Sequence, residues 1–159
     1  GLQVVQGSAL LPDEFTTAFF SDAELLHLAM PARIDTAVPA RSHLELSEPQ
    51  GGVGRARVNA PAFRDWQINA RLAVFSQAAL ATPIRPAAGR PPLVAGTLAA
   101  GAGAVLASAW AGSDAASAAF MGAFYDALAR GEALDVALMS AHDAPAVPDG
   151  WPRFQLWVE

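Results

Sequence analysis

A serine follows an apolar stretch in the segment RLAVFSQAALATP, at positions 71–83. The first six residues are typical of a buried strand, and the small residues after them are typical of a loop. Nucleophiles in α/β proteins are presented at such strand ends, so Ser76 is a candidate. A nucleophile elbow needs the pattern Gly-x-Ser-x-Gly, whereas bulky residues flank this serine on both sides. The next three residues, Gln77–Ala79, offer no nucleophile.

Metal, thiol and phosphate chemistry find no support in the sequence. The chain has no cysteine, which excludes disulfides, thiolate ligands and cysteine nucleophiles. It has no lysine, although a phosphate-binding P-loop ends in Gly-Lys-Ser/Thr. Its histidines, His27, His43 and His142, are scattered, so we expect no metal site and no cofactor. His27 lies inside an apolar run, and we interpret it as a core histidine with satisfied hydrogen bonds.

The overall charge is low and negative. A net charge of −5 gives no cationic face for nucleic acid, so we expect no nucleic-acid partner. Only 16% of the residues are charged, against about 25% in an average soluble domain, which indicates a large buried fraction or a sizeable partner surface. Residues 91–113 carry no charge and are long enough to cross a bilayer. They are mostly Ala and Gly, which insert poorly, so we expect no membrane span.

Patterns of strand and helix alternate along the chain. We expect strands at 2–7, 23–30, 43–47, 71–76, 104–109 and 154–158, and helices at 11–20, 60–69, 93–100, 113–131 and 133–142. The run 23–30 is compact and apolar, as in a strand buried on both faces, whereas 43–47 alternates like an edge strand. This order predicts an α/β fold of three layers, with a mainly parallel central sheet flanked by helices on both faces. The whole of 1–159 fits a single domain.

The C-terminal half carries a long ordered pattern, LVAGTLAAGAGAVLASAWAGSDAASAAFMGAFYDALARGEALDVAL and then WPRFQLWV. It holds a Gly/Ala-rich helix, a strand ending in Ser-x-Trp, an Asp that opens a helix, and a last strand with Trp and Phe. In these features the chain resembles the CHAT domain, a caspase-like peptidase module related to separases, caspases and gingipains. The resemblance implies a caspase-like fold. The family's early strands have no counterpart, so the chain resembles the later part of a larger CHAT region.

The resemblance also locates the family's catalytic dyad. The strand before the catalytic histidine usually reads Leu-His-Phe-Ala-Thr-His-Gly, and its counterpart here is LHLAMPA, residues 26–32. The histidine position is therefore Pro31. The second motif resembles Val-Leu-Ser-Ala-Cys-Glu, and its counterpart is VFSQAA, residues 74–79, which places the cysteine position at Ala78. Proline cannot act as a base and alanine cannot attack a carbonyl, so we interpret the site as naturally degenerate.

A cleft for a peptide can outlast the dyad. By resemblance, the substrate groove includes Ser108, Trp110 and Asp114, and acidic residues in this region are associated with basic side chains. Ser76 and Gln77 complete the candidate cleft.

We expect a catalytically inactive pseudopeptidase that binds a protein or peptide. Two alternatives stay open: a hydrolase that uses another nucleophile such as Ser76, and a purely structural oligomerisation domain. The Ala-, Arg- and Pro-rich composition suits a GC-rich bacterium, and we expect a cytoplasmic location. The oligomeric state is left open by the sequence.

Overall fold

The central sheet of the molecule is mainly parallel, as predicted. The computed structural model describes residue 20 and residues 22–45, 57–80, 89–108, 113–145, 147 and 154–158. Its four-stranded sheet has the order β1-β5-β6-β7. The strands are β1 (Leu25–Leu28), β5 (Leu72–Ala79), β6 (Ala104–Ser108) and β7 (Phe154–Val158). β1, β5 and β6 run parallel, and β7 runs antiparallel to β6.

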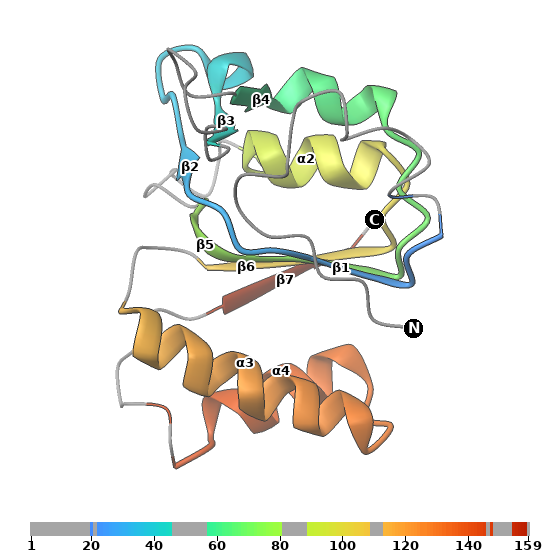
Figure 1. The fold of residues 1–159 in the computed structure, drawn as a ribbon, viewed down its shortest axis with the longest axis vertical. Coiled ribbons are helices and arrows are strands. Elements are labelled where there is room, and N and C mark those ends of the chain that lie inside the picture. The colour runs from blue at the N-terminus through green and yellow to red at the C-terminus, as the bar shows by residue number, and fades with distance from the viewer. Residues whose placement is uncertain are drawn as a thin grey trace, which may run out of the picture.

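Helices cover this sheet on both faces, which confirms the three-layer prediction (Figure 1). The helices are the 3-10 helix η4 (Ala60–Asp65), α2 (Pro92–Ala99), α3 (Asp114–Ala129) and α4 (Leu134–His142). η4 and α2 lie on one face, and α3 and α4 lie on the other (Figure 1). β6 is buried along its whole length because it lies between two strands and two helical layers.

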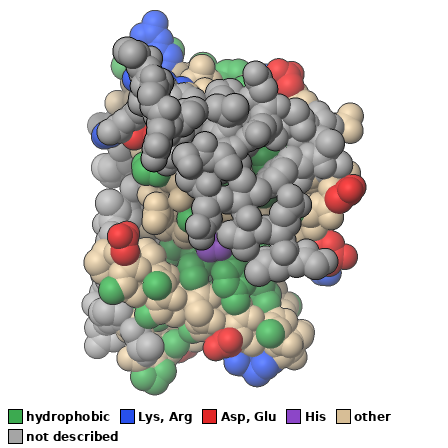
Figure 2. Space-filling model, viewed as in Figure 1, with side chains coloured by type: hydrophobic (Ala, Val, Ile, Leu, Met, Phe, Trp, Pro, Cys, Tyr) green, Lys and Arg blue, Asp and Glu red, His purple; other side chains and the backbone are tan. Residues whose placement is uncertain are grey.

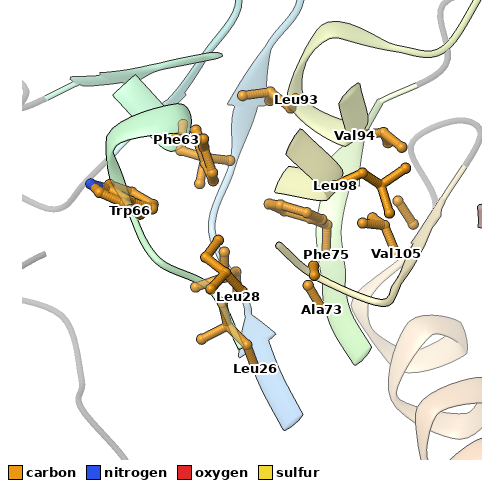
Figure 3. Close-up of a cluster of buried hydrophobic side chains, with 14 of the residues drawn as sticks. Leu26, Leu28, Phe63, Trp66, Ala73, Phe75, Leu93, Val94, Leu98 and Val105 are labelled. Carbon is orange, nitrogen blue, oxygen red and sulfur yellow. The ribbon is translucent and has the colours of Figure 1, made fainter. Parts of the chain in front are cut away.

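Each helical layer encloses its own hydrophobic core. On the α2 side, Phe75 of β5 points toward Phe63 of η4 (Figure 3), with ring centroids 6.4 Å apart. Phe63 packs in turn against Trp66 at 4.4 Å. On the α3 side, Phe120 stacks on Phe154 of β7 at 4.3 Å. β5 contributes side chains to both cores, because successive residues of a strand point to opposite faces.

Local signals in the sequence set the helix ends. The Ser113 side chain accepts a hydrogen bond from the Ala116 backbone N–H at 3.3 Å and caps α3. Asp114 places a negative charge in the first turn, where the helix dipole favours it. Gly131 follows the helix with a φ of +85°, a backbone conformation that glycine adopts without strain. The predicted helix 113–131 is therefore confirmed.

Two glycines allow close packing around α2. A Cβ at Gly96 would lie 2.7 Å from the carbonyl oxygen of Ala60, so only glycine lets α2 approach η4 this closely. Gly101 has a φ of +109°, and a Cβ there would lie 2.7 Å from the carbonyl oxygen of Ile68. The predicted Gly turn between the helix at 93–100 and β6 is thus a real constraint on the fold.

A second, smaller sheet lies in the connection from β1 to β5. It consists of β2 (Ala32–Arg33), β3 (His43–Glu45) and β4 (Arg57–Asn59) in the order β2-β3-β4, and the 3-10 helix η3 (Pro39–Arg41) precedes β3. The pairing is antiparallel throughout. The prediction of an edge strand at 43–47 is wrong, because β3 is the central strand of this sheet. Its alternation arises because only Leu44 is buried, while its neighbours are partly exposed.

The prediction that 23–30 is buried on both faces is also wrong. Leu26 and Leu28 are buried, but Leu25 is 42% exposed and His27 is exposed. The face of β1 that carries Leu25 and His27 is thus open to solvent. His27 is therefore not a core histidine.

The expected strand at 2–7 and helix at 11–20 lie outside the described residues, except for position 20. The uncharged segment 91–113 forms α2, a turn and β6 as far as it is described. Within the described ranges, none of the helices has the length and apolar character that crossing a bilayer requires.

Part of the apolar content lies on the surface. Val136 and Met139 of α4 are 48% and 66% exposed. Figure 2 shows hydrophobic side chains over the part of this face where α3 and α4 lie, with few charged groups among them. The low charge of the chain thus reflects both its cores and its surface.

Candidate functional site: the carboxyl edge of the central sheet

Three strand ends meet at one edge of the central sheet. Because β1, β5 and β6 are parallel, their carboxyl ends lie on the same side of the molecule (Figure 1). The small sheet and the start of α3 stand on that side too (Figure 1). Ligands of open α/β sheets bind beyond the carboxyl ends of the strands, so this edge is the candidate site.

The two positions that the resemblance assigns to the dyad follow or belong to neighbouring strands. Leu28 of β1 is the register partner of Phe75 of β5. Pro31 follows Leu28 by three residues, and Ala78 follows Phe75 by three residues. Pro31 thus lies between β1 and β2, whereas Ala78 lies within β5, the strand that pairs with β1. The backbone of residue 78 belongs to β5, while its side chain lies outside the described part of the structure.

Pro31 is held in a fixed connection to the small sheet. Its carbonyl oxygen accepts a hydrogen bond from the Glu45 backbone N–H at 2.8 Å. The Glu45 carboxylate in turn lies 3.1 Å from Nε of Arg33, two residues after the proline. Pro31 itself is exposed and carries no titratable group. It can therefore contribute surface to a ligand but cannot take a proton.

A bulge interrupts β5 at this edge. The register with β6 moves from Phe75 opposite Ala107 directly to Ala79 opposite Ser108. The three residues between, Ser76 to Ala78, therefore stand opposite no residue of β6. Bulges next to functional sites redirect side chains and end regular pairing. The bulge explains why the sequence indicated a loop after Ser76 although β5 continues to Ala79.

The other predicted cleft residues are only partly brought together. Ser76 and Gln77 lie in the bulge, the serine buried and the glutamine exposed. Ser108 ends β6 and is buried, and its carbonyl oxygen accepts a hydrogen bond from the Leu80 N–H at 3.1 Å. Asp114 is exposed at the start of α3. Trp110 lies outside the described residues.

A hydrogen-bonded chain of three side chains lies beside the bulge and was missed by the sequence analysis. Nε2 of His27 is 2.8 Å from Oγ of Ser76, and Nδ1 of His27 is 2.8 Å from the hydroxyl of Tyr125. The three residues come from β1, β5 and α3. The hydrogen bonds of His27 are thus satisfied, as predicted, although not inside the core. Sequence separations of 49 and 98 residues left no local signal for these contacts.

Desolvation shifts the pKa values of both titratable groups in this hydrogen-bonded cluster, His27 and Tyr125. Although part of His27 is exposed, desolvation by the surrounding atoms lowers its pKa below the ordinary value of 6.5. The same cause raises the pKa of Tyr125 from 10.0 to about 12. Both shifts favour the neutral form, so these three hydrogen-bonded side chains carry no charge at neutral pH.

Neither position that the resemblance assigns to the dyad carries an acid–base or nucleophilic group. A cysteine peptidase needs a thiolate and a base that generates it. Pro31 and Ala78 supply neither. Among the described residues, no group of three His, Asp or Glu side chains could hold a metal ion at the site.

The mostly parallel sheet between two helical layers is consistent with a caspase-like, peptidase-related α/β fold. The family model of the CHAT domain matches residues 2–157, nearly the whole chain. The chain therefore belongs to the CHAT domain family. A comparison with curated proteins finds no match.

Proposed function

We propose that this CHAT domain binds an extended peptide or a protein partner at the carboxyl edge of its sheet and does not cleave it. The observation that supports the proposal most is the register of β1 and β5. β1 pairs with β5, so Pro31, three residues after β1, and Ala78, within β5, follow neighbouring strands. By resemblance these are the positions of the family's base and nucleophile. Loss of both groups removes the cysteine-peptidase chemistry and leaves the strand ends and the start of α3 available for contact.

The partner that fits this edge is a chain segment with basic side chains. Asp114 is exposed at the first turn of α3 and can pair with an Arg or Lys of a ligand. Gln77 is exposed in the bulge and can hydrogen-bond to a peptide backbone.

The test is a fluorescence-anisotropy screen with a mixed peptide library, in which peptides with Arg or Lys are matched to peptides with Gln. Mass spectrometry of the same mixtures measures cleavage. We expect binding that prefers the basic peptides, with no cleavage products. Asp114→Asn should weaken the binding of basic peptides several-fold. Asp126→Asn, an equally exposed position farther along α3, is the matched control and should not.

Two other results would each replace the proposal. Cleavage of any library peptide would show an active peptidase. An absence of peptide binding, together with self-association in sedimentation velocity, would favour a structural oligomerisation domain.

A further inference from the structure

Three polar side chains outside the CHAT dyad form a hydrogen-bonded cluster beside the bulge in β5. Oγ of Ser76, Nε2 and Nδ1 of His27, and the hydroxyl of Tyr125 form one continuous chain with two contacts of 2.8 Å. Each residue comes from a different element, so packing of the whole domain fixes the chain. The sequence left Ser76 without a partner, because its flanking residues do not form a nucleophile elbow.

The order of these groups is that of an activated nucleophile. A serine hydroxyl is a weak nucleophile unless a base within hydrogen-bond reach accepts its proton, and that base must be oriented by a third group. His27 lies within reach of Ser76, and Tyr125 contacts the opposite nitrogen of the ring. Desolvation keeps the imidazole neutral at neutral pH, which is the form that can accept a proton.

The position of Ser76 in the strand supports this role. Leu72 and Val74 precede it on the same face of β5 and pack into the core under α3. Ser76 is the next residue on that face, and there the bulge removes β5 from register with β6. The serine is 8% exposed, whereas His27 beside it is exposed. Because little of the serine is exposed, its substrate must be small.

We propose that Ser76 is an acyl-accepting nucleophile for small activated esters, with His27 as its base and Tyr125 as a positioning residue. This activity is separate from peptide binding at the dyad positions and does not rest on it. In the reactive tautomer the Ser76 hydroxyl donates to Nε2, and the Nδ1–H donates to the Tyr125 oxygen.

The reaction needs only the ester and water. Oγ of Ser76 forms a bond to the ester carbonyl carbon while its proton passes to Nε2 of His27. The bond from that carbon to the leaving alcohol oxygen then breaks, and the alcohol takes the proton from the imidazolium. Water, deprotonated by His27 in the same way, attacks the acyl-serine, releases the carboxylic acid and restores the Ser76 hydroxyl.

The test uses the full chain with p-nitrophenyl acetate. Nitrophenolate release gives the rate, and peptide mapping by mass spectrometry of acid-quenched samples locates the acetyl group. We expect acetylation at Ser76, abolished in Ser76→Ala. His27→Gln should lower the rate by about 100-fold or more. Tyr125→Phe should lower it less and shift its pH profile, because the ring nitrogen loses its partner. Ser140→Ala is the matched control, because Ser140 contacts Glu132 and not His27. This variant should react at the same rate as the chain without substitutions.

An acetyl group found only on other residues would overturn the proposal. So would a rate that is unchanged in Ser76→Ala. Because the mapping uses the unmodified chain, the proposal stays testable even if a variant fails to fold. Peptide binding in the anisotropy screen is measured separately, so failure here leaves that result unaffected.

Discussion

The hydroxyl of Tyr125 lies 2.8 Å from Nδ1 of His27, and through this contact α3 is joined to the edge strand of the central sheet. The ring of His27 also lies 5.7 Å from the Tyr125 ring, centroid to centroid. The contact links two groups whose charged forms are both disfavoured by burial. Two titrations can therefore report on it.

Tyr125 should ionise at unusually high pH. It is the single tyrosine of the chain, so the ultraviolet absorbance of tyrosinate reports this residue alone. Burial raises its pKa from 10.0 to about 12, and we expect the native chain to titrate near the higher value. The chain in concentrated urea should titrate about 2 pH units lower, near the reference value. Equal midpoints in the two conditions would show that the hydroxyl is not buried.

His27 should make the fold sensitive to acid. Burial lowers its pKa in the native state, so the unfolded chain binds a proton first as pH falls below 6.5. The stability present above this pH is then lost progressively as pH falls through the lowered native pKa. Urea unfolding at a series of pH values from about 8 to about 5 measures this loss.

Two variants test whether His27 causes this loss of stability at acid pH. His27→Gln should show a smaller decline in the free energy of unfolding over the same pH range. His142→Gln, at the end of α4, is the matched control and should retain the full His27-dependent decline. An identical decline in all three chains would contradict the role of His27.

A cysteine and a histidine introduced at the two positions that the resemblance assigns to the dyad should give a reactive thiol. The chain has no cysteine, so Ala78→Cys introduces a single thiol that iodoacetamide can report. With an ordinary thiol pKa near 8.5, only a few per cent is thiolate at pH 7. Adding Pro31→His should lower the thiol pKa and raise the alkylation rate about tenfold. An equal rate in the single and double variants, both folded by circular dichroism, would show that positions 31 and 78 do not face each other.

The glycine after α2 should be intolerant of a side chain. Gly101→Ala forces a positive φ on alanine and brings its Cβ within 2.7 Å of the Ile68 carbonyl oxygen. We expect a loss of at least about 1–2 kcal/mol in the free energy of unfolding. Gly122→Ala is the matched control, because that glycine lies within α3 and a Cβ there meets nothing within 4 Å. It should gain about 0.5–1 kcal/mol. Equal effects in urea unfolding would contradict the packing around Gly101.

Most of the secondary structure followed from the sequence because its signals are local. Ser113 and Gly131 lie at the two ends of α3, as expected, and the apolar face of this helix has the expected spacing. The predictions failed where burial depends on distant segments. The residues at 43–45 alternate as an edge strand would, yet strands on both sides pair with them. The run at 23–30 is apolar, yet one face of β1 stays exposed. Whether a strand face is covered depends on segments far away in the sequence.

The sequence by itself determined the α/β class, the motifs of the CHAT family and the identity of Pro31 and Ala78, since residue types and their spacing carry that information. Only the tertiary structure decided that β1 and β5 are adjacent, and that Ser76, His27 and Tyr125 meet. The physical reason is that the register of parallel strands and the docking of a helix are fixed by packing between segments tens of residues apart. No local pattern specifies such contacts.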